Sequence, residues 1–360
     1  MNKTALNGLR DMLLEGGHAA YVSFAPPLNQ YLTGFRGTTS GVIVTDSEAL
    51  FLCDFRYAEQ AEVQVDSAFT IERIGSEGMT KAVARRLNAL KLSNAAFEPQ
   101  YMTYAEFQAL DREFGGKLKP VSQLVSALRT RKTSEEVERI RTALRLSERV
   151  LEEILEELEP GITEREVAAR FEYAFKQRGA SGASFPTIAL FGSRSSLPHG
   201  EPGDRALQMG DVVLFDFGCR LDGYCSDLTR TYVFGTIPGA WLEDIYALTH
   251  TAQQRAIEAV RAGISCQDLD AVARSLIAEA GHGDHFGHGL GHGVGIEIHE
   301  APRVGIHSDT TLEPGMVITI EPGVYLPGQG GVRIEDVVVV EDEGCTVLSS
   351  APKEFRILHR

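Results

Sequence analysis

The sequence from Asp211 to Phe234, DVVLFDFGCRLDGYCSDLTRTYVF, consists of two apolar runs on either side of an Asp-Gly dipeptide at positions 222–223. Asp-Gly favours the tight type I′ turn that joins neighbouring antiparallel strands, so this segment predicts a β-hairpin. A two-residue turn here places Asp216 opposite Thr229 and makes Asp216 and Asp227 diagonal neighbours on one face. We therefore expect the two carboxylates to converge.

Converging carboxylates have a physical cost that needs an explanation. Asp216 and Asp227 would repel each other and lose hydration on a half-buried sheet face, unless one is protonated or a cation neutralises both. A solvent-facing pair on an edge hairpin is the alternative. The hairpin by itself is compatible with either arrangement.

Histidines lie among glycines in a second unusual segment, Gly287–Glu300, GHGLGHGVGIEIHE. Three of the ten histidines of the chain, His288, His292 and His299, lie within these residues. Glycine costs about 1 kcal/mol relative to alanine inside a helix, so the segment predicts a loop or an irregular strand. Glycines also let the backbone approach a ligand closely, and clustered imidazoles are typical of a binding or catalytic site.

Two glutamates interrupt the strands predicted near the C-terminus. Glu321 ends one strand, and Glu335 lies inside the apolar run Val332–Val340, which is typical of one buried strand. Arg333, Glu335 and Asp336 are costly in such a strand unless they are paired or bind a metal. An ion pair between Arg333 and Glu335 is the purely structural alternative.

Together, the three segments supply four carboxylates and one imidazole, without a thiolate. This ligand set suits divalent ions such as Mn, Co or Zn, and the charge of four carboxylates is best balanced by two of them. Two such ions about 3.5 to 4 Å apart can generate a hydroxide near neutral pH and polarise a carbonyl group. The sequence therefore predicts two divalent metal ions per subunit and a hydrolytic reaction.

The chain is long enough for two domains. Up to about residue 126, short apolar runs, including a predicted hairpin at Gly41–Cys53, alternate with helical stretches, which predicts an α/β domain over residues 1–128. Capping boxes at Thr133 and Thr163 then open two amphipathic helices, and strand-rich sequence follows beyond residue 180. We expect a second domain over residues 129–360 and an α+β fold for the chain as a whole.

Composition narrows the possible partners and locations. Apolar residues make up 43% and charged residues 24%, which is typical of a globular protein. The formal charge of -15 disfavours binding to nucleic acid or to an anionic membrane. Five scattered cysteines without a C-x-x-C spacing predict free thiols in a reducing compartment. With neither a secretory signal nor an apolar stretch of about 18 residues, we expect a cytoplasmic protein without nucleic-acid or membrane partners.

These segments resemble the pita-bread metallopeptidases, specifically the proline-specific branch that contains prolidase (Xaa-Pro dipeptidase) and aminopeptidase P. The stretch YLTGF at Tyr31–Phe35 and the linker LRTRKTSEEVERIRTA are also similar to that branch, so the resemblance covers most of the chain. It implies a creatinase-like N-terminal α/β domain and a C-terminal pita-bread domain with a curved antiparallel sheet. It also implies a homodimer in which one subunit's N-terminal domain closes the active site of its partner.

The resemblance further implies roles for the acidic residues. Asp216 would bind one metal ion, and Asp227 and Glu335 would bridge both. His292 with Glu321 would complete the other site. Mn is the expected metal, with Co or Zn as alternatives. A hydroxide bridging the two ions would attack the carbonyl carbon before proline, and Glu321 would shuttle its proton.

Four basic side chains would surround the metal ions. His199 in SLPHG, His288 and His299 would line the substrate pocket and stabilise the oxyanion. Arg333 would orient the acidic site from its flank. Arg303, in HEAPR, resembles the arginine of prolidase that receives the free carboxylate of a dipeptide.

These roles predict hydrolysis of Xaa-Pro dipeptides. Xaa-Pro aminopeptidase activity on longer peptides with proline at the second position is the first alternative. A catalytically silent binding protein of the same fold and creatinase-like C–N hydrolysis without metal are the others. The intact ligand set argues against both of these.

Overall fold

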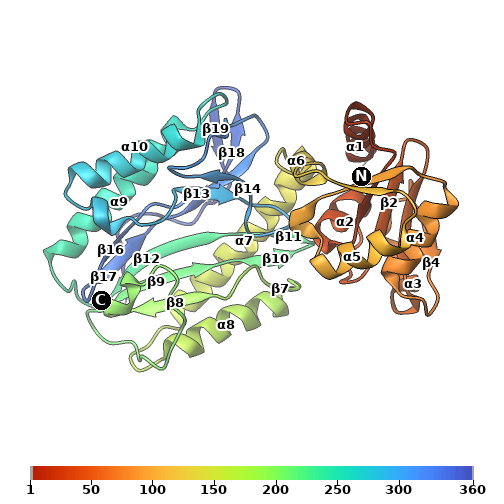
Figure 1. Ribbon diagram of the computed structural model, residues 1–360. Helices are drawn as coiled ribbons and strands as arrows, with labels where there is room; N and C mark the ends of the chain where they lie inside the picture. Colours follow the sequence, from red (N-terminus) through yellow and green to blue (C-terminus); the bar gives the residue numbers. More distant parts are fainter. Residues whose placement is uncertain (1–2, 359–360) are drawn as a thin grey trace. The chain divides into compact units, whose positions relative to one another are not determined.

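The protein folds as two compact units that divide between Arg129 and Thr130. The computed structural model describes residues 3–358, so the ends of the two predicted domains, residues 1–2 and 359–360, lie outside the described residues (Figure 1). Each unit has its own hydrophobic core. None of the helices within residues 3–358 combines the length and apolar character needed to span a bilayer.

The first unit is an α/β domain built on a mixed six-stranded sheet with the order β4-β3-β2-β1-β5-β6. The predicted hairpin at Gly41–Cys53 is confirmed as the antiparallel pair β2–β3, whereas β3–β4, β1–β5 and β5–β6 are parallel. Its elements are α1 (Lys3–Glu15), β1 (Ala20–Ser23), α2 (Pro26–Thr33), β2 (Gly41–Thr45), β3 (Ala49–Cys53), η1 (Phe55–Tyr57), α3 (Ala58–Gln64), β4 (Thr70–Arg73), α4 (Met79–Ala89), β5 (Asn94–Phe97), η2 (Pro99–Tyr101), α5 (Tyr104–Glu113), β6 (Lys117–Pro120) and α6 (Val125–Leu128).

The second unit begins with two helices, α7 (Ser134–Glu156) and α8 (Glu164–Gln177), whose predicted capping boxes are both formed. Thr133 and Thr163 each accept a hydrogen bond from the backbone N–H of the glutamate three residues later, and that glutamate accepts one in return. The apolar faces of α7 and α8 pack with strand residues such as Phe215 into one core of this unit. Both helices therefore pack against the strands of the predicted hairpin.

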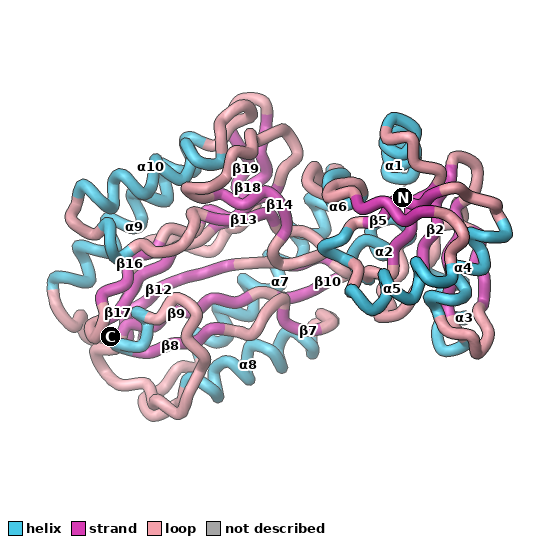
Figure 2. Tube along the Cα trace, in the orientation of Figure 1, coloured by secondary structure: helices cyan, strands magenta, loops and turns pink. Residues whose placement is uncertain are grey.

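Strands lie at the centre of the second unit, with the helices outside them (Figure 2). One sheet has the order β20-β12-β9-β8 and another has the order β14-β13-β15-β18-β19. The described pairings are antiparallel apart from β12–β20, and α9 and α10 cover the second of these sheets. The elements after α8 are β7 (Gly182–Ala183), β8 (Ile188–Phe191), η3 (Gly192–Ser196), β9 (Val212–Phe217), β10 (Cys219–Leu221), β11 (Tyr224–Cys225), β12 (Leu228–Phe234), α9 (Ala240–Ala259), α10 (Cys266–Glu279), η4 (Gly283–His285), β13 (Gly291–Gly293), β14 (Glu300–Val304), β15 (Val317–Ile320), β16 (Gly323–Leu326), β17 (Gly330–Arg333), β18 (Asp336–Glu341), β19 (Gly344–Val347) and β20 (Ile357–Leu358).

The predicted register of the Asp211–Phe234 hairpin is confirmed. Asp216 on β9 pairs with Thr229 on β12, and the residues that flank the turn pair directly. The turn residues Asp222 and Gly223 have φ values of 49° and 85°, the positive values that a type I′ turn requires. The turn therefore fixes which side chains share the face that carries Asp216.

The single strand predicted over Val332–Val340 is wrong. Strand β17 ends at Arg333 and pairs with β16, whereas β18 begins at Asp336 and pairs with β15. Glu335 lies in the break, where its N–H donates to the carbonyl of Thr229 on β12. The chain changes sheets at this point because a third strand accepts the hydrogen bond that would otherwise continue the ladder.

Candidate active site

Three side chains from separate parts of the second unit meet, the buried Asp227 and Glu335 and the half-buried His292. Asp227 lies between β11 and β12, His292 lies on β13, and Glu335 lies between β17 and β18. One ligand atom from each lies within 4.8 Å of the others. Asp227 is 4% exposed and Glu335 is 1% exposed, so neither carboxylate is balanced by bulk water. A cation in this cluster would neutralise them.

Asp216 joins this cluster from the neighbouring strand β9. Its Oδ2 accepts a hydrogen bond of 2.6 Å from Nη2 of Arg333, so Arg333 pairs with Asp216 and the proposed structural pair of Arg333 with Glu335 is not formed. Oδ1 of Asp216 is buried and has no hydrogen-bond partner within the described residues. A buried carboxylate oxygen without a hydrogen-bond donor is typical of a group that ligates a metal ion.

His292 presents a nitrogen lone pair to the acidic residues. Its Nδ1 lies 3.1 Å from the carbonyl of Gly293, so Nδ1 carries the proton and donates, which leaves Nε2 as an acceptor. Nε2 lies 3.3 Å from Oε1 of Glu321 and 3.5 Å from Oδ2 of Asp227. Burial, with a smaller effect of His299, lowers the pKa of His292 to about 4, so the ring is neutral at pH 7. A lone pair that faces carboxylate oxygens needs a cation or a proton between them.

Three of the carboxyls, those of Asp227, Glu335 and Glu321, have raised pKa values when no cation is present. Burial, followed by repulsion from Glu335, raises the pKa of Asp227 well above its usual value. Burial, followed by repulsion from Glu321, does the same to the pKa of Glu335. Burial raises the pKa of Glu321 to about 8. The donor set of four carboxylates and one imidazole therefore fits divalent ions of the Mn, Co and Zn kind, which would displace these protons.

Hydrogen bonds fix two of these groups further. The hydroxyl of Thr319 on β15 accepts from the N–H of His292 and donates to Oε1 of Glu321 over 3.2 Å. The hydroxyl of Thr229 donates to Oε2 of Glu335 over 2.8 Å and accepts from Nε of Arg333. Both threonines therefore orient carboxylates that burial alone would leave free to rotate.

Tyr325 on β16 is a residue that the sequence analysis missed. Its hydroxyl accepts from Nη1 of Arg333 at 2.8 Å and lies 2.8 Å from Nε2 of His288. Because Nδ1 of His288 donates to the carbonyl of Gly289, Nε2 is the acceptor and Tyr325 donates to it. The sequence offered one sign of this role, a tyrosine in the otherwise aliphatic GVYL strand that follows Glu321.

The remaining predicted residues lie around the same cluster. His299 is exposed, and its ring meets that of His292 edge to face at 4.4 Å between centroids. Arg303 on β14 is exposed and pairs across the strands with His292, so the two side chains share a face. Burial, then the charges of His199 and Arg303, lower the pKa of His299. His199 is exposed on the loop that follows η3.

The sequences of the two units match two known protein families. Residues 138–342 match metallopeptidase family M24, and residues 6–131 match the creatinase/prolidase N-terminal domain. The chain belongs to metallopeptidase family M24. The active-site cluster lies within the matched M24 region.

Relatives within the family are similar over nearly the full length of the chain. The Xaa-Pro dipeptidase of Pyrococcus furiosus is 37% identical over 93% of this chain and 94% of that protein. The structure of Xaa-Pro dipeptidase from Bacillus anthracis is 38% identical, with a TM-score of 0.94 over 98% of this chain and 99% of that one. X-Pro aminopeptidase from Thermotoga maritima is 34% identical, with a TM-score of 0.89 over 95% and 98%. The α+β fold with an N-terminal α/β domain and a pita-bread domain is thus confirmed.

Proposed function

We propose that this M24 metallopeptidase is an Xaa-Pro dipeptidase that hydrolyses the bond before proline in dipeptides. The observation that carries the proposal is the convergence of Asp216, Asp227, His292, Glu321 and Glu335 in one cluster whose members are buried or half-buried. Relatives named Xaa-Pro dipeptidase that match almost the whole chain support the substrate class. The peptide bond to proline has no N–H, so this site must recognise the ring and the carbonyl group instead.

We further propose that the cluster holds two divalent cations, Mn for preference, with Co or Zn as alternatives. Asp216 would bind one ion, Asp227 and Glu335 would lie between the two, and His292 with Glu321 would bind the other. Such ions supply a nucleophile near neutral pH and stabilise the negative charge that develops on the carbonyl oxygen. The unpaired Oδ1 of Asp216 and the free lone pair of His292 support this assignment.

Proton transfer falls to Glu321 in this proposal. Its carboxylate lies between the hydroxyl of Thr319 and the ring of His292, where it can take a proton from the attacking water. The nitrogen of proline needs a proton before it can leave, and Glu321 can return that proton. Glu321 is therefore both a ligand and the proton carrier.

The three histidines would have two different roles. His199 and His299 are exposed and can donate a hydrogen bond to the oxyanion. His288 has both ring nitrogens engaged, so we propose that it lines the pocket and orients the hydroxyl of Tyr325. Arg333 holds Tyr325 and Asp216 together on the flank of the cluster.

Arg303 is proposed as the group that selects dipeptides. It shares a face with His292, so a substrate that reaches the cluster can place a free carboxylate against the guanidinium. The resemblance to an X-Pro aminopeptidase structure keeps cleavage of longer peptides as the second candidate. Comparison of kcat/KM for an Xaa-Pro dipeptide and for the same sequence extended by two residues tests the proposal. Preference for the longer peptide would overturn it in favour of an aminopeptidase.

Two further features are proposals. We infer a homodimer from the resemblance to prolidases, and gel filtration that gives a monomer at working concentration would contradict it. The five cysteines are free thiols, which supports a reducing location such as the cytoplasm. Neither the proposed dimer nor the proposed location changes the chemistry that we propose for the active site.

A further inference from the structure

Arg230 is a fully buried arginine that lies next to Thr229 on β12, on the side away from the acidic cluster. It is 1% exposed, and all five N–H groups of its guanidinium are used. Nε donates to the carbonyl of Pro352 over 3.1 Å, Nη1 to the carbonyls of Thr229 and Glu335, and Nη2 to Oδ1 of Asp336 and the carbonyl of Ala351. One side chain thus joins the backbone of Glu335 to a segment near the C-terminus.

The carboxylate of Asp336 completes this connection. Its Oδ1 accepts from Arg230, and its Oδ2 accepts from Lys353 and from Nε2 of Gln253 on α9, the latter at 2.9 Å. The segment 350–358, which we call the C-terminal strap, is therefore tied to both β12 and β18. Glu148 on α7 also accepts hydrogen bonds from the strap, including one from the N–H of Ala351.

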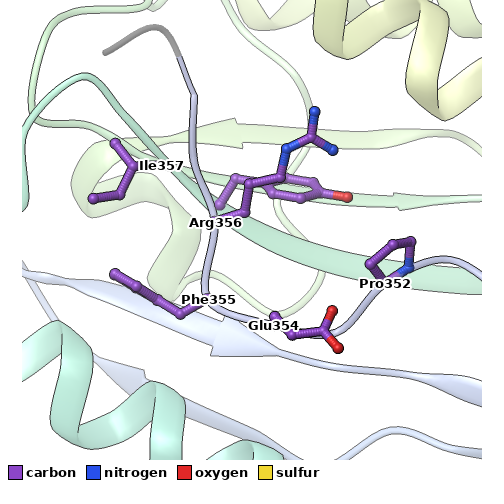
Figure 3. A pocket seen from close by; sticks show the side chains of 6 residues that line it. Pro352, Glu354, Phe355, Arg356 and Ile357 are labelled. Carbon is purple, nitrogen blue, oxygen red and sulfur yellow. The ribbon is translucent and has the colours of Figure 1, made fainter.

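The outer side of the strap borders a cavity rather than a packed core (Figure 3). This cavity of about 420 Å³ is lined by Tyr232, Pro352, Glu354, Phe355, Arg356 and Ile357. Tyr232 lies two residues after Arg230, so both side chains point from the same face of β12 toward the strap. The strap also packs against the core through Phe355 and Ile357, and its strand β20 pairs with β12. The hydrogen bonds of Arg230 and Lys353 add to these contacts.

Glu335 receives contacts from both sides of the break in which it lies. Its N–H donates to the carbonyl of Thr229, its carboxylate accepts from the hydroxyl of Thr229, and its own carbonyl accepts from Arg230. We propose that Arg230, with Asp336 and the C-terminal strap, is a positioning group that fixes Glu335 for metal binding. This inference rests on the proposed metal-binding role of Glu335.

A contribution to protein stability does not by itself account for a buried network of this kind. A buried ion pair is often replaced by apolar residues without loss of stability, because desolvation offsets its attraction. A site that must hold a carboxylate in one orientation has a different requirement, because partners outside the ligand shell set the geometry and affinity of the metal. Arg230 meets that requirement, because it donates a hydrogen bond to the carbonyl of Glu335.

The test is the Mn²⁺ affinity of Arg230→Lys in the full-length protein. Lysine keeps the charge beside Asp336 but has three donors, so at least two of the five acceptors lose their hydrogen bond. We expect the affinity, measured by titration calorimetry on metal-stripped protein well below its Tm, to fall about 10- to 100-fold. We also expect the visible spectrum of the Co²⁺-loaded variant to shift, because it reports ligand geometry.

Two further variants separate positioning from general stability. Asp211→Asn breaks the ion pair of Asp211 with Arg205 at the start of β9, in the same unit but without contact to Glu335, so it should lower Tm and leave the Mn²⁺ affinity unchanged. Lys353→Met removes the cation of the strap from Asp336 without a direct contact to Glu335. It should weaken Mn²⁺ binding in the same direction as Arg230→Lys but less, and it carries the test if Arg230→Lys does not fold.

The outcomes distinguish this inference from the proposed function. Native protein that binds no divalent metal overturns both. Native affinity and an unchanged Co²⁺ spectrum in Arg230→Lys and Lys353→Met overturn the positioning role alone. Equal weakening in Asp211→Asn also overturns it, because the effect would then be a general loss of stability.

Discussion

Removal of metal should make the second unit less stable as the pH rises from 6.5 to 8. Burial raises the pKa of Asp227 and Glu335 well above the usual range and that of Glu321 to about 8. In the unfolded chain these carboxyls ionise near pH 4. The folded, metal-free protein therefore binds more protons than the unfolded chain, and its free energy of unfolding falls as the pH rises.

The pH window matters because histidines with a lowered pKa, His288 and His292 above all, have the opposite effect. Burial lowers the pKa of His288 and His292 to about 4, whereas unfolded histidines titrate near pH 6.5. Between those values the unfolded chain binds more protons on these rings, so stability rises with pH and opposes the carboxyls. Above pH 6.5 the unfolded histidines lose their remaining protons, so their opposing effect fades and the buried carboxyls increasingly determine the slope.

The expected magnitude follows from the number of protons retained. One proton held by the folded state contributes about 1.4 kcal/mol per pH unit, so a single retained proton lowers the free energy of unfolding by about 2 kcal/mol between pH 6.5 and 8. Bound Mn²⁺ would ionise the same carboxyls in the folded state and remove this slope. The stabilisation by metal should therefore grow with pH across the window.

Guanidinium unfolding at several pH values, with and without Mn²⁺, measures this slope. The single tryptophan, Trp241 on α9, reports on the second unit alone, which avoids mixing the two units in one transition. Asp227→Asn is the matched variant, because it removes the central carboxyl and should flatten the slope of the metal-free protein. A metal-free protein whose stability stays constant or rises from pH 6.5 to 8 would refute the reasoning, since its carboxyls would already be ionised.

Three other substitutions test the residues around the cluster. Tyr325→Phe removes the hydroxyl that lies between Arg333 and His288. We expect kcat to fall about 10- to 100-fold, with KM and the Mn²⁺ affinity nearly unchanged. A change confined to KM would contradict this. Gly323→Ala should reproduce that loss, because its Cβ would clash with the hydroxyl oxygen of Tyr325. A native kcat in this variant would show that the tyrosine can move without cost. Arg303→Ala should raise KM about 10- to 100-fold for an Xaa-Pro dipeptide but should change it little for the C-terminal amide of the same dipeptide. Equal effects on both substrates would show that Arg303 does not bind the carboxylate.

The sequence was sufficient to predict those features whose backbone conformation depends on residues close together in the chain. The Asp222-Gly223 turn fixed the register of the hairpin, and the threonine caps fixed the start of two helices. These features depend on interactions within a few residues, so one sequence contains all the information that they need.

Predictions that depend on distant partners were less complete. Val332–Val340 has the composition of one buried strand, but the chain divides there because Thr229, about 100 residues away, takes the hydrogen bond from Glu335. Tyr325 and Arg230 were missed for the same reason. Apart from Thr229 beside Arg230, their partners lie 8 to 122 residues away, and hydrogen bonds between such segments have no periodicity along the chain.

Three of the four acidic residues of the cluster share a structural feature that links the fold to the chemistry. Asp227, Glu321 and Glu335 each lie just outside a strand, and His292 lies at a shift in the register between β13 and β14. At such positions the ladder of backbone hydrogen bonds is interrupted, so a side chain can turn away from the usual alternation and aim at a common point. Uninterrupted strands would send neighbouring side chains to opposite faces. The breaks in the sheets therefore bring these three carboxylates to Asp216 on β9, and the cation that we propose makes their burial possible.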